Sequence, residues 1–129
     1  MKHVAALLVL SLLGPTSAAR ADTYPRQPGV DAVHYVFRLA LLDGDSNEIR
    51  GEAAVDLRFV SDGVKEIFLD LTSAAEGRGM TVSAVSIGGQ SILFTHQNDR
   101  LRIPLPSPSK AGQEASVTIQ YRGVPAEGL

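Results

Sequence analysis

The sequence predicts an all-β domain, either an antiparallel sandwich or a saddle-shaped pair of sheets with about seven short strands. Two observations point to strands: apolar and polar residues alternate with period two along most of the chain after residue 30, and turn-forming glycines and prolines separate the alternating segments. A third excludes helices, because no amphipathic pattern of ten or more residues is present.

Seven segments show this pattern and are expected to be strands: residues 31–42, 48–60, 64–71, 80–87, 91–97, 100–105 and 114–122. The first two flank the turn-like sequence DGDSN, so we expect them to pair as a long antiparallel hairpin. Gly88 and Gly89 predict a second hairpin, because glycine accepts the positive φ angles of a two-residue turn.

The first segment is apolar on both of its faces. One face carries Val33, Tyr35, Phe37, Leu39 and Leu41. The opposite face carries Val36, Ala40 and Leu42, and only His34 and Arg38 interrupt this apolar face. Ala54 and Val60 extend it along the second segment. A simple sandwich would leave one face of the strand polar, so this opposite face is predicted to be a docking surface. Coverage by neighbouring strands, or by residues 22–29, is the alternative.

The first 21 residues have the layout of a secretory signal peptide. Lys2 gives a basic tip, an apolar run follows from Val4 to Leu13, and Ala19-Arg20-Ala21 matches an A-x-A cleavage site. We place the cut after Ala21, with a cut after Ala19 as the weaker alternative. The apolar run is about half the length that a membrane-spanning helix needs, so no transmembrane segment is expected and the protein should be secreted or periplasmic.

The rest of the chain has the size and composition of one domain. Cleavage after Ala21 leaves 108 of the 129 residues, with ten basic residues against 14 acidic ones and a net charge of −4. An acidic chain without a basic stripe argues against nucleic acid and against anionic membranes as partners. The sequence has no cysteine, which excludes a disulfide framework. Residues 22–30 contain two prolines and are interpreted as an extended lead-in.

The sequence offers few candidate ligands for a metal ion. After the signal peptide, only His34 and His96 could serve as histidine ligands, and each lies in a strand pattern, so we interpret both as surface or rim residues. Asp43, Asp45 and Asn47 match the first three ligand positions of a calcium-binding EF-hand loop.

The calcium match then fails, because Glu48 occupies the glycine position and Ala54 occupies the position of the bidentate glutamate. A hairpin turn is the better interpretation of this loop. The sequence also lacks a G-x-S-x-G nucleophile motif. It therefore predicts no catalytic, cofactor-binding or metal-binding residue in this chain.

Several motifs follow one another in a recognisable order: Asp31, two residues and His34-Tyr35, then EIRGEAAVDLRF, IFLDLTS, VSAVSIGGQ, HQNDRLRIPLP and IQYRGVPAEGL. In this order and spacing, residues 31–129 resemble the N-terminal β domain of the aminopeptidase N family, the gluzincin zinc metallopeptidases. Each motif alone is weakly specific. Their co-occurrence carries the resemblance.

The resemblance implies a catalytic domain that this sequence does not contain. The family's Gly-x-Met-Glu-Asn loop, its H-E-x-x-H helix and its distal glutamate are all absent, so zinc belongs to the complete enzyme. We therefore expect a truncated, inactive chain that serves as a structural and substrate-access domain and docks on the missing catalytic domain. Peptide substrates are expected only for the complete enzyme. A free-standing secreted β-sandwich used for binding or adhesion is the alternative.

Overall fold

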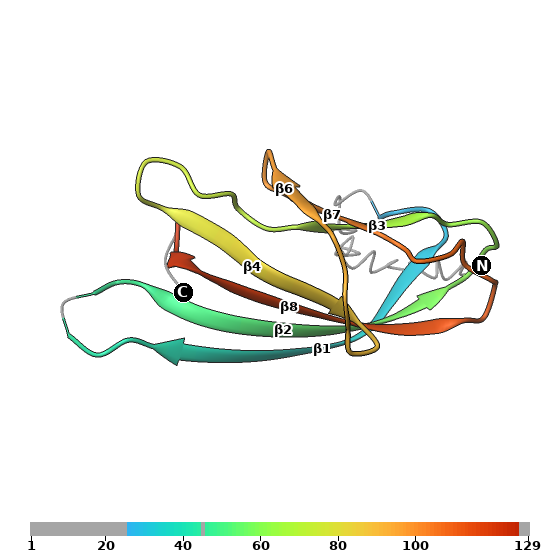
Figure 1. Cartoon of the computed structure of the whole chain (residues 1–129), viewed down its shortest axis with the longest axis horizontal. Helices are drawn as coiled ribbons and strands as arrows, with labels where there is room; N and C mark the ends of the chain where they lie inside the picture. Colours follow the sequence, from blue (N-terminus) through green and yellow to red (C-terminus); the bar gives the residue numbers. More distant parts are fainter. Residues whose placement is uncertain (1–25, 45, 127–129) are drawn as a thin grey trace, which may run out of the picture.

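The computed structural model describes residues 26–44 and 46–126. Within them the chain forms eight antiparallel strands in two layers and no helix, which confirms the predicted all-β fold (Figure 1). The strands are β1 (Val30–Leu41), β2 (Ile49–Phe59), β3 (Glu66–Asp70), β4 (Gly79–Ile87), β5 (Gln90–Ser91), β6 (Thr95–Gln97), β7 (Arg100–Pro104) and β8 (Glu114–Val124). The predicted signal peptide, residues 1–21, lies outside the described residues.

The larger layer is a five-stranded sheet with the order β1-β2-β8-β4-β5. The predicted first hairpin is confirmed, because β1 pairs with β2 from Val30 opposite Phe59 to Leu41 opposite Ile49. The register shifts between Ala32 and His34, so Val33 is the extra residue of a β-bulge. The bulge breaks the period-two alternation, and Ala32 therefore faces the same side as Tyr35.

The smaller layer is a three-stranded sheet with the order β3-β7-β6. The expected strand at residues 91–97 is in fact two short strands that belong to different sheets. After the confirmed turn at Gly88 and Gly89, β5 pairs with β4, and the chain then crosses to the smaller sheet, where β6 pairs with β7. The alternation of residues could not show this crossing, because it continues through the connection.

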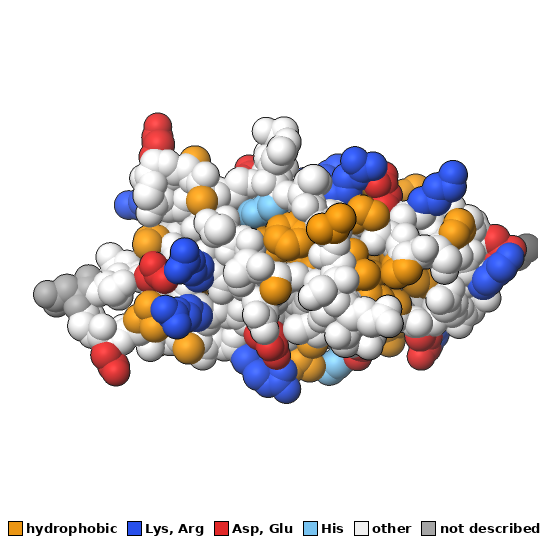
Figure 2. Space-filling model, viewed as in Figure 1, with side chains coloured by type: hydrophobic (Ala, Val, Ile, Leu, Met, Phe, Trp, Pro, Cys, Tyr) orange, Lys and Arg blue, Asp and Glu red, His pale blue; other side chains and the backbone are white. Residues whose placement is uncertain are grey.

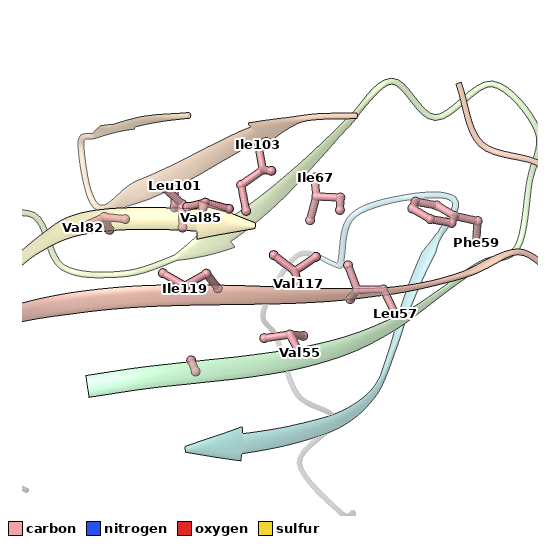
Figure 3. Close-up of a cluster of buried hydrophobic side chains, with 11 residues drawn as sticks. Val55, Leu57, Phe59, Ile67, Val82, Val85, Leu101, Ile103, Val117 and Ile119 are labelled. Carbon is pink, nitrogen blue, oxygen red and sulfur yellow. The ribbon is translucent and has the colours of Figure 1, made fainter. Parts of the chain in front are cut away.

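The core lies between the two sheets (Figure 3). Val55 and Leu57 of β2, with Val117 of β8, point toward Ile67 and Ile103 of the smaller sheet. Each of these five side chains is at most 2% exposed. Burial of aliphatic side chains contributes about 1.5–3 kcal/mol each, so this contact between layers is the main stabilising feature of a domain without disulfides.

The start of the described chain is tied to the smaller sheet by Gln27. Its side-chain nitrogen donates to the carbonyl oxygen of Glu66 at 2.8 Å, and its side-chain oxygen accepts from the backbone N–H of Phe68 at 2.9 Å. The side chain thus satisfies backbone groups at the edge of β3, as a neighbouring strand would. The lead-in ends one residue earlier than expected, because Val30 already belongs to β1.

The two layers differ in length, and this difference shapes the surface. In Figure 1 the β1–β2 hairpin and the end of β8 extend well beyond the smaller sheet. Among the described residues, no strand of the smaller sheet therefore lies above the inner face of this overhang, although Ile49 on β2 is only 5% exposed. None of the described residues forms a helix of the length and apolarity needed to cross a membrane.

Candidate functional site

Most of the large hydrophobic side chains that are exposed among the described residues lie on β1. Five of its side chains are about half exposed or more: Val33 (52%), Tyr35 (48%), Phe37 (61%), Leu39 (49%) and Leu41 (71%). Val33, the bulge residue, lies beside Asp56 and Ser116 of the outer face, so it leaves the row predicted from the sequence, and the exposed row of the inner face consists of the other four. The Tyr35 and Phe37 rings stack with their centroids 6.0 Å apart and an interplanar angle of 6°. An ordered apolar row of this kind is typical of a surface that another element covers.

An apolar groove of about 310 Å³ runs beside this row, between the two sheets. Tyr35 and Phe37 form its outer rim, Ile119 of β8 lines the same layer, and Leu69 and Leu101 line the opposite one. Figure 2 shows hydrophobic side chains reaching the surface in the gap between the layers. The groove is open because β1 is the last strand of its sheet and the smaller sheet does not reach across it.

The sequence placed the docking surface on the other face of the hairpin. The structure leaves Ala40 and Val60 exposed there, and Val36, Ala54 and Leu42 half-buried. None of Val36, Ala40 and Leu42 is fully buried, so this face stays a predicted docking surface. The large exposed side chains of Tyr35, Phe37, Leu39 and Leu41 lie on the inner face instead, which the sequence analysis did not single out, because membership of one strand face does not tell whether another layer covers it.

Tyr121 lines the groove, and Gly51 makes room for its ring. They are register partners on β2 and β8, and the tyrosine ring occupies the space where a Cβ atom on residue 51 would lie. The absence of a side chain at Gly51 therefore lets the ring lie flat over the sheet. Burial raises the pKa of the Tyr121 hydroxyl above its ordinary value of 10.0.

The two candidate histidines lie on different sheets. His34 is exposed on the outer face of β1, opposite Asp56 of β2. His96 is half-buried on β6, and its Nε2 atom is 2.7 Å from the carbonyl oxygen of Leu71. Among the described residues, no three histidine or carboxylate side chains come together as a metal site would require.

His96 belongs to a cluster with Ser73 and Asp99 that has the composition of a catalytic triad but not its geometry. The Leu71 carbonyl can only accept, so Nε2 must donate to it and cannot take a proton from the Ser73 hydroxyl, 3.4 Å away. The Asp99 carboxylate accepts from the Ser73 backbone N–H at 2.8 Å rather than from the imidazole. The cluster therefore fixes a turn and does not activate a nucleophile.

The candidate calcium loop connects β1 to β2. Asp43 and Asn47 are exposed, Asp45 lies outside the described residues, and the Ser46 hydroxyl accepts a hydrogen bond from the Glu48 N–H at 3.1 Å. Ala54, at the position of the bidentate ligand, is paired inside β2. The predicted hairpin turn is thus confirmed, and strands flank it where an EF-hand has helices.

The charged residues of the outer sheet face form ion pairs across strands. Glu52 pairs with Arg38 at 3.0 Å, and Arg58 pairs with Glu114 at 3.2 Å. The arginine side chains are 69% and 49% exposed, so each pair contributes about 1 kcal/mol or less. These pairs join β1 to β2 and β2 to β8 on the outer face of the larger sheet.

Neither the protein-family models nor the curated proteins include a match to this sequence. Solved structures do match. A two-domain M1 zinc metallopeptidase mutant bound to L-tryptophan has a TM-score of 0.65 and 24% identity, with 77% of this chain and 21% of the other covered. An M1 zinc metallopeptidase mutant from Deinococcus radiodurans bound to a Tyr-Ser-Ala substrate has a TM-score of 0.67 and 23% identity, with 80% and 22% covered.

This chain has the fold of part of an M1 zinc metallopeptidase. The likeness confirms, at the level of fold, the resemblance inferred from the order of sequence motifs. The chain spans only about a fifth of the length of the metallopeptidases that it matches. The sequence did not indicate that the inner row of β1 is exposed. Its exposure follows from the edge position of β1 and from the short smaller sheet, and neither leaves a pattern in the residues of β1 itself.

Proposed function

We propose that this chain is the N-terminal β domain of an exported zinc aminopeptidase and acts as its structural and substrate-access module. The observation that carries the proposal is the M1 metallopeptidase fold over about four-fifths of this chain, matched to about a fifth of much longer chains. The motif order from Asp31 onward supports the same assignment. Export rests on the signal-like residues 1–21, with the cut after Ala21.

In this proposal the rest of the peptidase docks on the inner face of the β1–β2 hairpin. The exposed row of β1 and the groove behind Tyr35 and Phe37 supply the apolar area for this contact. Because the hairpin extends beyond the smaller sheet, another domain can reach this face. The free energy available is substantial, because each large apolar side chain that becomes fully buried contributes about 1.5–3 kcal/mol.

An immunoblot of the source cells tests the assignment. An antiserum raised against residues 26–126 should detect an exported polypeptide several times longer than 129 residues, and peptide sequencing of that band should find an H-E-x-x-H motif. A single band near the size of this chain would contradict the proposal and favour the alternative, a free-standing secreted β-sandwich for binding or adhesion.

We expect purified residues 22–129 neither to bind zinc tightly nor to release amino acids from peptide amides. The zinc ligands and the general base of the family are missing from the sequence, and His34 and His96 lie on separate sheets. Zinc titration calorimetry and an aminoacyl-amide assay measure this. Turnover that persists through repeated purification and through replacement of both histidines would contradict the expectation, since it would require a different site.

A further inference from the structure

We propose that this chain forms a two-fold dimer in which β1 pairs antiparallel with β1 of a second copy, so that two five-stranded sheets join into one of ten strands. The inference concerns residues 22–129 in isolation, where the rest of a peptidase does not compete for the row on β1, and it does not rest on the proposed function. It starts from the position of β1 at the end of the sheet order.

The free edge of β1 is unusually long for a protein that keeps its sheets apart. β1 has 12 residues, whereas the opposite edge of the same sheet, β5, has two, and the edge strands of the smaller sheet have five and three. Proteins normally protect such an edge with lysine, proline or a bulge. β1 contains neither lysine nor proline, and its one arginine, Arg38, is paired with Glu52 of β2. Beyond the bulge at Val33, His34–Leu41 is a regular edge that no other described strand pairs with.

The two faces of β1 restrict how two copies can pair. Residues directly opposite each other in an antiparallel pair point to the same face. Beyond the bulge, the apolar row of β1 occupies odd-numbered positions. The rows of the two copies therefore join into one surface only if odd-numbered residues lie opposite odd-numbered ones, and even opposite even. Such pairing places a residue, and not a peptide bond, on the two-fold axis.

Charge then selects the residue on the axis. A two-fold at Arg38 would place two guanidinium groups directly opposite each other, which is destabilising. A two-fold at Val36 would place His34 opposite the partner's Arg38 and bring the bulge at Val33 into the pairing. A two-fold at Phe37 places Arg38 opposite the partner's Val36 and pairs the regular segment His34–Ala40, so the bulge at Val33 meets only the strand end at Leu41. A two-fold at Leu39 would pair only residues 37–41 within β1.

The shape of the protomer fits this register. Val30, Ala32 and Tyr35 line a cavity of about 390 Å³ together with Ile67 and Phe68 of β3, so the smaller sheet lies near the first half of β1 without covering it. The second half, with Leu39 and Leu41, belongs to the uncovered overhang. An antiparallel pair with Phe37 on the axis brings the partner's smaller sheet to the side of this uncovered half, where it can shield the exposed leucines.

Disulfide trapping tests the register, and the absence of cysteine from the chain gives a clean background. Directly opposite residues of an antiparallel pair have Cα atoms about 4.5–5.5 Å apart, within the range that a disulfide bridges. Phe37→Cys in residues 22–129, which contain the whole described fold, should therefore give cross-linked dimer as the main product of mild oxidation. Leu41→Cys is the matched control, because the two copies of residue 41 would be eight positions apart along the paired strands, roughly 27 Å.

Analytical ultracentrifugation tests the association itself. Unmodified residues 22–129 should sediment as a dimer, and Phe37→Lys should raise the dissociation constant at least about tenfold, because it removes one buried aromatic side chain per copy. Leu93→Lys, at a residue 89% exposed and away from β1, should leave the dimer unchanged. A monomer at all concentrations, or equal cross-linking of Phe37→Cys and Leu41→Cys, would overturn the proposal. If Phe37→Lys fails to fold, the cross-linking experiment still tests it.

Discussion

Replacing Phe59 with alanine is expected to lower the free energy of unfolding by about 3–5 kcal/mol. Phe59 is the last residue of β2, is 1% exposed, and points into the core between the two sheets (Figure 3). Its backbone groups are held by Gln113 and Gly112 at 2.8 and 2.7 Å, so the strand end cannot collapse into the cavity. Chemical denaturation followed by circular dichroism measures the loss.

Phe37→Ala is the matched control for this substitution. It removes the same atoms from the adjacent strand β1, but Phe37 is 61% exposed. We expect a loss below about 1 kcal/mol, measured at a protein concentration where the chain is monomeric. Equal losses for the two variants would show that the row on β1 is covered within the isolated domain, which would contradict the docking surface as well as the dimer.

Replacing Gly79 with alanine is expected to lower the free energy of unfolding by about 2–5 kcal/mol, from backbone strain and overpacking together. Gly79 opens β4, is buried, and has a φ angle of +88°. A Cβ atom at this position would overlap the backbone carbonyl of Ser73, which a parallel bridge to Met80 holds in place. Thermal and denaturant unfolding both report the effect.

Gly77→Ala separates the two contributions. Gly77 has a similar φ of +78°, but nothing lies within 4 Å of an added Cβ atom. This variant should lose only the conformational part, about 1–2 kcal/mol. The overlap with the Ser73 carbonyl explains the difference between the two variants, and a Gly79→Ala variant no less stable than Gly77→Ala would show that the 72–73 segment moves aside easily.

The sequence by itself determined the local features of this protein. The alternation of side chains in residues 31–42 and 48–60 predicted β1, β2 and their hairpin, and Gly88 and Gly89 predicted the turn before β5. These predictions succeed because a strand's two faces and a turn's φ angles depend on residues next to each other. The order of such motifs was also enough to indicate the metallopeptidase fold.

The tertiary structure alone decided which of these faces are covered. Tyr35 and Val55 are register partners on the same sheet face, yet Val55 is 2% exposed and Tyr35 is 48% exposed. The difference arises because the smaller sheet packs over β2 and β8 and stops short of the edge strand. Burial depends on which distant strands pack against each other across the core, and the alternation of residues along one strand does not indicate which strands these are.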